Sequence, residues 1–459
     1  MEMSLGEIAG ILDAASAAPE IVARGYSIDS RTINPGELFF AISGKNFDGH
    51  DFVSTALLRG ATGAVVGRGF AAGNPAIAPK LLAVADPALA FRTLATAVRK
   101  RWGKPLVAIT GSAGKSTTKE MLAAILAKRY AVHRTPGNLN NEFGLPLTLL
   151  ALQPDHDNAV VELAMSSAGE IARLTRIAEP NVGVVTNVAP VHLEFFDSVE
   201  SIARAKRELI ENLRAGSTAV LNNDDHRVKR FQQGFPGRVV TFGFEPGATF
   251  RASDLRTKNE TMTEFMVSGD GIGERFELPL PGRHNVLNAL AAIASASLFK
   301  VEAAEMREAL AQYQTLRQRS EIITLPDGIT VLNDSYNSNP LAMEKMLETI
   351  AAWPGAKRRI VVAGEMLELG PTSPELHKEV GRKCAEAGIA WLLAVRGDAK
   401  FFADGARERG FPEERALFFE TAAQAGEHCL TLVQSGDLVL VKGSRGVHLE
   451  KVVEMLRAA

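Results

Sequence analysis

Cysteine is almost absent from the chain, since only Cys384 and Cys429 occur among 459 residues. Two cysteines outside any CxxC spacing exclude a disulfide framework and a cysteine-rich metal site. An excess of charge of one sign is also missing, because 51 lysines and arginines stand against 53 aspartates and glutamates. This balance gives no electrostatic reason to expect nucleic acid or an anionic membrane surface as a partner.

Long apolar runs are missing as well. No segment approaches the roughly 20 consecutive apolar residues that a membrane-spanning helix needs. Residues 1–10 carry acidic side chains and lack a basic region followed by an apolar core, so they do not predict a signal peptide. We therefore expect a cytoplasmic protein without membrane insertion. Internal repeats and low-complexity tracts are also absent, and 46% hydrophobic residues are ordinary for globular domains.

The length predicts about three domains, at roughly 100–200 residues each. Residues 1–85 contain short predicted strands and helices separated by turn signals, and the Gly-, Ala- and Pro-rich stretch 67–79 predicts a loop. Residues 86–318 and 319–459 both alternate apolar strands with helices. Such alternation favours an α/β fold with a mostly parallel sheet covered on both faces.

Particular segments carry this alternation. Within residues 86–318, 238–280 alternate between apolar and polar side chains, which predicts an antiparallel β insertion, with strands at 239–242 and 263–267. The other predicted strands are 106–110, 159–163, 182–186, 329–332, 359–363 and 438–441, and the predicted helices include 88–102, 115–128 and 198–213.

A glycine-rich loop follows the strand predicted at 106–110. It reads Thr-Gly-Ser-Ala-Gly-Lys-Ser over residues 110–116 and opens the helix that begins at Lys115. Glycines let the backbone wrap around a phosphate, and the N–H groups of a helix start favour an anion. Lys115 would reach the β- and γ-phosphates of ATP, and Ser116 would offer its hydroxyl to Mg²⁺. The pattern departs from GxxxxGK[ST], because Ile109 stands where the first glycine would be.

Three further residues are candidates for the same site. Glu162 ends a predicted apolar strand, where a carboxylate can hold Mg²⁺ beside a phosphate loop. His192 follows the next predicted strand, and Lys206 lies in the helix predicted at 198–213. By themselves, the histidine fits a structural role and the lysine fits a solvated helix surface.

Together these motifs resemble the Mur ligase family, which builds the peptidoglycan precursor. The loop at 110–116, Glu162, Thr186-Asn187 with His192, and Lys206 follow the family's order, as do the stretch 282–292 and Asp334. The resemblance covers essentially the whole chain. It implies a small α/β domain that binds UDP, a central P-loop-type ATPase domain with the β insertion, and a C-terminal Rossmann-like α/β domain.

Within the family, the chain is most similar to the branch that joins D-alanyl-D-alanine to UDP-N-acetylmuramoyl-tripeptide. Residues 138–146 resemble its GNxNNxxGxP segment, 334–340 its DxYNANP segment and 442–445 its KGSR segment. The DNPR stretch of the relative that adds diaminopimelate or lysine is missing. The family often has Ser-His after the acidic strand end, where this chain has Ser166-Ser167.

The resemblance implies roles for particular residues. ATP and two Mg²⁺ ions are the expected cofactors, and Lys206 is expected to be carbamylated and to share the second Mg²⁺ with His192. The implied catalytic residues are Lys115, Glu162, His192 and Lys206, and the implied metal ligands are Ser116, Glu162, His192 and carbamylated Lys206. The implied ATP-binding residues are Gly111, Ser112, Ala113, Gly114, Lys115, Ser116, Thr117, Asn285 and Asn288 at the adenine, Arg319, and Asp334 at the ribose. The implied substrate-binding residues are Ser30, Arg31, Asn46, Asp48, His50, Asn138, Asn140, Asn141, Ser166, Tyr336, Asn337 and Asn339.

Two other interpretations remain open at this stage. The chain could be another ligase of the family, such as a third-residue-adding enzyme or a folylpolyglutamate synthase. In a different class, it could be a nucleotide-binding regulator without catalytic activity. The partners expected from the main hypothesis are UDP-N-acetylmuramoyl-tripeptide and D-alanyl-D-alanine, and the expected oligomeric state is a monomer.

Overall fold

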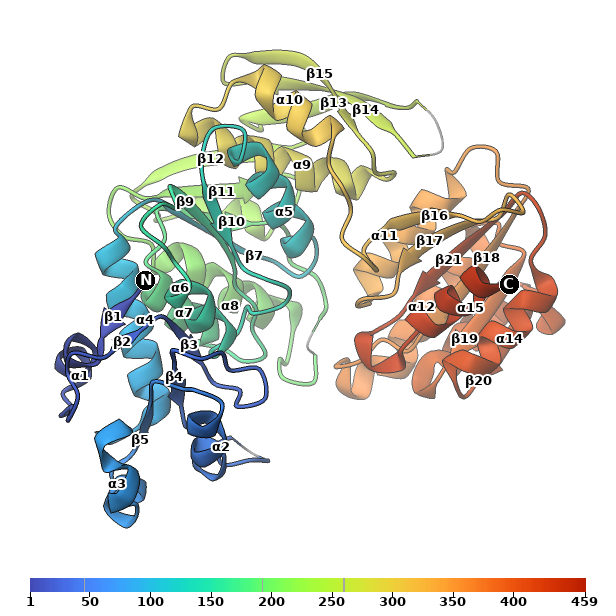
Figure 1. Ribbon diagram of the computed structural model, residues 1–459. Helices are drawn as coiled ribbons and strands as arrows, with labels where there is room; N and C mark the ends of the chain where they lie inside the picture. Colours follow the sequence, from blue (N-terminus) through green and yellow to red (C-terminus); the bar gives the residue numbers. More distant parts are fainter. Residues whose placement is uncertain (45, 192, 259–260) are drawn as a thin grey trace.

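The chain folds around three main β-sheets that follow one another in sequence (Figure 1). The computed structural model describes residues 1–44, 46–191, 193–258 and 261–459. In Figure 1, the blue first unit lies below the green and yellow second unit, and the orange and red third unit lies beside the second. The ends of the strands in the second and third sheets position the site described below.

The first sheet has four parallel strands in the order β3-β4-β5-β6. The loop predicted at 67–79 is wrong, because the segment forms the short helix α3 and a 3-10 helix at Pro75–Lys80. Alanines favour helix, proline suits a first helical position, and Phe70 and Ile77 pack on the small core beneath. The elements of this unit are β1 (Met3–Ser4), α1 (Leu5–Leu12), β2 (Val22–Ala23), β3 (Gly25–Ser27), β4 (Glu37–Phe40), α2 (Val53–Leu58), β5 (Gly63–Gly67), α3 (Arg68–Gly73) and β6 (Leu81–Val84).

The second sheet has nine strands in the order β15-β14-β13-β12-β11-β10-β7-β9-β8. Side chains alternate across it: Leu106 and Ala108 of β7 join one core, and Val107 and Ile109 join the other. Both faces are therefore covered, which explains why the strands are continuously apolar. The strands are β7 (Leu106–Thr110), β8 (Val132–Arg134), β9 (Asn158–Glu162), β10 (Val182–Val185), β11 (Thr218–Asn222), β12 (Arg238–Gly243), β13 (Phe250–Thr257), β14 (Thr263–Gly269) and β15 (Ile272–Leu278).

Helices fill the two cores of this sheet. The residues of α4, α6, α7 and α8 pack in one core, and those of α5, α9 and α10 pack in the other. The predicted helix at 88–102 is confirmed within one residue, and Ser198 caps the helix predicted to begin there. The bounds are α4 (Pro87–Trp102), α5 (Lys115–Leu126), α6 (Gly144–Leu150), α7 (Glu170–Ala178), α8 (Val199–Glu211), α9 (Arg283–Ala296) and α10 (Ala303–Ala311).

The β insertion needs one correction. Strands β13, β14 and β15 pair antiparallel, as predicted for 263–267. The strand predicted at 239–242 is instead parallel to β11, so β12 continues the parallel part of the second sheet and β13 is added to its edge. The alternating pattern misled the prediction because a half-buried strand alternates whichever way its neighbours run.

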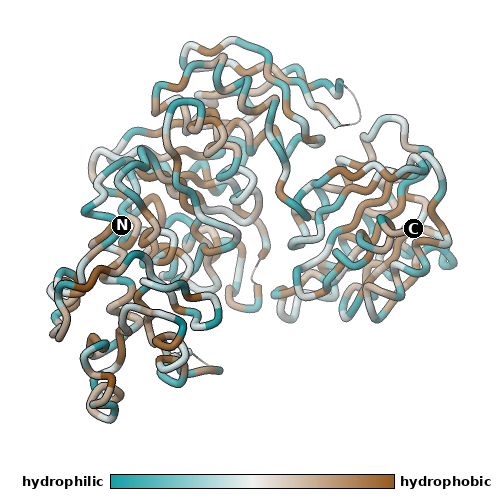
Figure 2. The backbone as a smooth tube through the Cα atoms, in the orientation of Figure 1, coloured by the Kyte–Doolittle hydropathy of each residue, from teal (hydrophilic) through white to brown (hydrophobic). Residues whose placement is uncertain are grey.

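The third sheet has the order β16-β17-β21-β18-β19-β20, and only β16 is antiparallel to its neighbour. Figure 2 shows apolar stretches along its strands and hydrophilic ones in many of its outer loops. Helices α11, α12 and α13 pack on one face, and α14 and α15 on the other. The elements are β16 (Glu321–Thr324), β17 (Thr330–Asp334), α11 (Pro340–Ala351), β18 (Arg358–Gly364), α12 (Ser373–Glu386), β19 (Trp391–Val395), α13 (Lys400–Glu408), β20 (Ala416–Phe419), α14 (Ala422–Leu432), β21 (Asp437–Lys442) and α15 (Glu450–Ala458). Among the described helices, none has the length and apolarity needed to cross a bilayer.

Candidate active site

The glycine-rich loop lies where the strand order of the second sheet reverses. From β7 the chain proceeds outward to β8 and back to β9, and then crosses to β10 on the other side of β7. Ligands of open α/β sheets bind at such switch points, beyond the carboxyl ends of the strands. The loop joins the end of β7 to the start of α5, so its N–H groups lie at a helix N-terminus.

Two glycines are required by the shape of this loop. Gly111 has a φ of +154°, and a Cβ there would stand 1.9 Å from the hydroxyl oxygen of Thr186. Gly114 has a φ of +80°, and its Cβ would stand 2.2 Å from Oδ1 of Asn288. Neither position accepts a side chain without moving its neighbours. Asn288 therefore packs directly on the phosphate loop.

Residues after β10 hold the loop from the other side. The Ala113 N–H donates to Oδ1 of Asn187 at 2.8 Å, and the Thr186 hydroxyl donates to the Ala113 carbonyl at 2.6 Å. The Ser112 N–H donates to the backbone carbonyl of Asn187 at 3.0 Å. These bonds explain why a Thr-Asn pair occurs at this strand end: both side chains fix the backbone that would surround a phosphate.

Buried Ser116 and Glu162 form a cluster below the loop with partly buried Asn140. The Ser116 hydroxyl donates to Oε2 of Glu162 at 2.7 Å, and the Asn140 amide donates to Oε1 at 2.8 Å. Glu162 is only 2% exposed. One carboxylate and one hydroxyl beside a phosphate loop are hard oxygen donors suited to Mg²⁺, which completes its shell with phosphate oxygens and water. The cluster thus fits the predicted metal ligands.

Two lysines face the same region. Lys115 donates to the Gly111 carbonyl at 2.9 Å, and burial lowers its pKa, partly offset by the carboxylate of Glu162. Lys206 on α8 is 2% exposed, so it does not lie on the solvated helix surface that its sequence context alone would suggest. Burial, together with the charge of Lys115, holds the pKa of Lys206 well below its ordinary value. His192 lies outside the described residues.

A cavity of about 590 Å³ opens from the phosphate loop toward the third unit. The predicted residues that line it are Ser112, Ala113, Gly114, Lys115, Ser116, Thr117, Asn138, Asn140, Glu162, Asn285, Asn288, Arg319, Asp334, Tyr336, Asn337 and Asn339. They come from the segments that follow β7 and β8, from the end of β9, from the end of β17 and the segment after it, from the start of α9, and from the segment just before β16. The fold therefore brings most of the predicted nucleotide site into one space between two units.

The third unit contributes a buried ion pair. Lys442 at the end of β21 donates to Oδ2 of Asp334 at the end of β17, and to the carbonyl of Asn337 at 3.0 Å. Burial by itself would raise the pKa of Asp334, but the Lys442 ammonium and the Ser320 N–H outweigh it and hold this pKa below its ordinary value. Asp334 therefore remains a carboxylate that can accept hydrogen bonds from a ligand.

Several lining residues had no predicted role. His284, beside Asn285, has its pKa lowered to about 4, mainly by burial, so its ring is neutral at physiological pH. Lys442, Ser444 and Arg445 line the cavity from the loop after β21. The sequence could have indicated these three residues, because the KGSR stretch follows a predicted parallel strand. Ligands bind at the carboxyl ends of such strands.

The predicted substrate residues of the first unit do not line this cavity. The ring of His50 is already engaged on both sides: Nδ1 lies 2.7 Å from Oδ1 of Asp48, and Nε2 accepts from the Gly67 N–H at 2.9 Å. His50 thus fixes the turn rather than presenting a free nitrogen. Arg31 is exposed and paired with Asp29. Ser30 is buried, and Asn46 is exposed.

Of the other described residues predicted for the site, Gly111, Lys206, Asn141 and Ser166 also lie outside the cavity lining. The side chain of Asn141 accepts the N–H groups of Phe143 at 3.1 Å and Gly144 at 2.9 Å, which shapes the start of α6. Ser166 is exposed, and its N–H donates to the carboxylate of Glu170. The geometry thus gives Asn141 a structural task, while the side chain of Ser166 is free to meet solvent.

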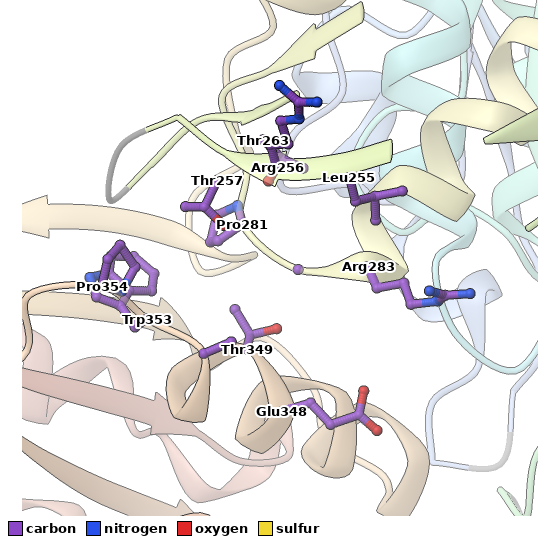
Figure 3. A pocket seen from close by; sticks show the side chains of 12 residues that line it. Leu255, Arg256, Thr257, Thr263, Pro281, Arg283, Glu348, Thr349, Trp353 and Pro354 are labelled. Carbon is purple, nitrogen blue, oxygen red and sulfur yellow. The ribbon is translucent and has the colours of Figure 1, made fainter. Parts of the chain in front are cut away.

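A second, smaller cavity of about 190 Å³ lies between the second and third units (Figure 3). Figure 3 shows Arg283 on one side, and Glu348 and Thr349 of α11 on the other. Gly282, which also lines it, packs so closely on Thr349 that a Cβ would stand 2.5 Å from the Thr349 hydroxyl. This cavity contains none of the phosphate-loop or metal-ligand candidates, so the larger one is the candidate active site.

Comparisons with known proteins agree with this geometry. Three family models match the chain: "Mur ligase family, catalytic domain" at residues 23–130, "Mur ligase middle domain" at 109–296, and "Mur ligase, glutamate ligase domain" at 318–445. The UDP-N-acetylmuramoyl-tripeptide–D-alanyl-D-alanine ligase of Escherichia coli is 35% identical, with 100% of this chain and 99% of that protein covered. The ligase of the same name from Bacillus subtilis is 32% identical, covering 95% and 94%.

Solved structures show the same likeness in three dimensions. A crystal structure of MurF from Acinetobacter baumannii has a TM-score of 0.90 at 28% identity, covering 100% of this chain and 99% of that one. MurF ligase from Thermotoga maritima in complex with ADP has a TM-score of 0.84 at 28% identity, covering 95% and 97%. Since the matches extend over all three units and include the phosphate loop, the chain belongs to the Mur ligase family.

Proposed function

We propose that this chain joins D-alanyl-D-alanine to UDP-N-acetylmuramoyl-tripeptide and converts ATP to ADP and phosphate. The observation that supports this choice within the family is the match over nearly the full length to ligases of that name. A carboxylate oxygen of the tripeptide attacks the γ-phosphorus, and ADP leaves. The dipeptide amine, after losing a proton, attacks the carbonyl carbon of the acyl phosphate, and the C–O bond to phosphate breaks.

The phosphate loop serves the first of these steps. Lys115 moves from the Gly111 carbonyl to the γ-phosphate, where its charge neutralises the charge of the two reacting anions. Ser116 and Glu162 would hold Mg²⁺, which would supply Lewis-acid stabilisation of the phosphate oxygens. Asn140 donates to the second oxygen of Glu162 and so holds the carboxylate in one orientation.

Lys206 is proposed to be carbamylated and, with His192, to hold a second Mg²⁺. Its low pKa supports this, because a neutral amine is the form that adds to CO₂, losing a proton to give a carbamate. The modification would place an anion beside the Lys115 ammonium where the neutral amine stood, which is electrostatically favourable. Intact-protein mass spectrometry with the carbamate trapped should show an added mass of about 44 Da, and high-resolution density should show the extra carboxylate on the Lys206 amine. An unmodified Lys206 amine in the nucleotide-bound protein would refute this proposal.

The remaining roles are those that the resemblance to the family implies. Asp334 receives the ribose hydroxyls, Arg319 reaches the phosphates, and Asn285 and Asn288 meet the adenine side of the nucleotide. Tyr336, Asn337, Asn339 and Asn138 surround the reacting groups. Residues 1–85 bind the UDP end through Ser30, Arg31, Asn46 and Asp48, with His50 fixing the turn. We take 86–318 and 319–459 as the other domains, and expect a cytoplasmic monomer.

The test is ADP release by the purified protein with ATP, Mg²⁺, UDP-N-acetylmuramoyl-tripeptide and D-alanyl-D-alanine, omitting each component in turn. Release that needs all four, with a UDP-linked pentapeptide detected by mass spectrometry, is the expected result. Tripeptides with diaminopimelate and with lysine are compared in parallel. Release only with a free amino acid on a shorter precursor would assign another reaction of the family, and no release with any acceptor would support a nucleotide-binding regulator.

A further inference from the structure

Arg445 follows Lys442 in the loop after β21 and lines the large cavity. Its neighbours in the chain are firmly held. The hydroxyl of Ser444 accepts from the Leu367 N–H at 3.0 Å, and the Arg396 guanidinium donates to the carbonyl of Gly446. The backbone on both sides of Arg445 is therefore fixed, while its side chain is exposed to the cavity.

Five cationic side chains line this cavity, and three of them are already engaged. Lys115 bonds the Gly111 carbonyl, Lys345 pairs with Glu348 at 2.7 Å, and Lys442 pairs with Asp334. Within the described ranges, the guanidinium groups of the other two, Arg319 and Arg445, form no ion pair within 4.0 Å and no hydrogen bond, although the charge of Arg319 acts on the nearby Asp334 carboxylate. Unpaired guanidinium groups at a cavity wall are suited to an anionic ligand.

The ring of Tyr336 holds both of these arginines. The guanidinium carbon lies 4.1 Å from the ring centre for Arg319 and 5.6 Å for Arg445. Such contacts orient a guanidinium without using its N–H donors. The charge of Arg319 helps to lower the pKa of both Lys115 and Asp334, so Arg319 lies near the two groups assigned to the nucleotide. Arg445 is thus the cation left for a second anion.

We propose that Arg445 binds the terminal carboxylate of the incoming dipeptide, with Tyr336 orienting its guanidinium. This inference rests on the proposed function, because it concerns the acceptor of that reaction. The dipeptide carries one amine and one carboxylate at opposite ends. Its amine must face the acyl phosphate at the loop of Lys115, so its carboxylate needs a cation farther along the cavity wall. A guanidinium can bind both carboxylate oxygens through two parallel N–H donors.

The test compares D-alanyl-D-alanine with its C-terminal amide, which lacks the charge, in steady-state ADP release. For the enzyme without substitutions, the amide should give a kcat/KM roughly 10- to 100-fold lower than the free dipeptide. This is the size expected for the loss of one charged hydrogen bond. Arg445→Gln should raise the KM for the dipeptide by a similar factor and leave the KM for ATP within about twofold. In Arg445→Gln the kcat/KM values for the dipeptide and its amide should become nearly equal. Arg445→Lys should restore part of the preference for the free carboxylate.

Controls separate this inference from its alternatives. Arg409→Gln removes an exposed arginine of the same unit, which is paired with Glu386 at 3.5 Å. It should leave kcat and the KM values for ATP and for the dipeptide unchanged. If Arg445→Gln keeps the full preference for the free carboxylate, the assignment is wrong. A raised KM for ATP with preserved preference would assign Arg445 to the nucleotide phosphates instead. Absence of ligation by the unmodified enzyme would refute the proposed function itself, which is a separate outcome.

Discussion

The buried pair of Lys442 and Asp334 should contribute more to stability than an exposed pair of the same chemistry. Lys442 is 2% exposed and its Asp334 partner 16%, measured on the side chains. Lys442→Met keeps the side-chain length but leaves a carboxylate without its cation in a buried site. Removing one partner of a buried pair lowers the free energy of unfolding by about 3–5 kcal/mol. Because Asp334 keeps some exposure, we expect a loss of about 3 kcal/mol for Lys442→Met.

Lys378→Met is the matched control. Lys378 pairs with Glu408 at 3.5 Å, and the two side chains are 30% and 44% exposed. Exposed pairs contribute about 0–1 kcal/mol, so this change should have little effect. Urea unfolding followed by intrinsic fluorescence suits the comparison, since Trp353 and Trp391 both lie in the third unit. If Lys442→Met and Lys378→Met both lower the free energy of unfolding by the same small amount, the reasoning is refuted.

The pH dependence gives a second check with a defined sign. In the unmodified protein the folded-state pKa of Asp334 is lowered, so its contribution is present above the unfolded value of about 4 and is lost as pH falls through the folded value. Without Lys442, burial dominates and raises this pKa. Protonation then removes the unpaired charge, and the deficit of Lys442→Met should shrink between pH 7.5 and pH 5. The double change with Asp334→Asn should be less destabilising than Lys442→Met alone at pH 7.5.

Two further predictions concern the phosphate loop. Gly114→Ala should weaken ATP binding at least tenfold in calorimetry, because the added Cβ meets Asn288. Gly216 also has a positive φ, but a Cβ there would meet open space, so Gly216→Ala should leave the affinity for ATP unchanged. Glu162→Gln should lower kcat by roughly 10²- to 10³-fold and raise the Mg²⁺ concentration needed for ADP release, whereas Glu408→Gln on the surface should do neither. Retained Mg²⁺ dependence and kcat in Glu162→Gln would exclude it as the metal ligand.

Local sequence was sufficient where one short segment makes the structure. The phosphate loop needed only a strand, two glycines and a helix start, and the structure has β7 end and α5 begin at the predicted residues, Thr110 and Lys115. Glu162 was likewise predictable as a strand end. In contrast, the direction of β12 depends on β11, a partner that no pattern within 239–242 specifies.

Residue environments were the harder part. Lys206 has the sequence context of a surface helix, and only the packing of α8 makes it a buried amine with a low pKa. His50 has the context of a ligand, but the turn at Asp48 and the Gly67 N–H use both of its ring nitrogens. Burial and hydrogen-bond partners come from segments distant in the chain, so they cannot be inferred from neighbours in sequence.

The sequence alone determined the family, the order of the three units and the position of the phosphate loop, because these depend on local patterns and on motifs in a fixed order. Only the tertiary structure decided which residues share one cavity. Lys115, Asp334 and Arg445 are each more than a hundred residues apart in the chain. They face one space because the carboxyl ends of parallel strands in two different sheets open toward each other.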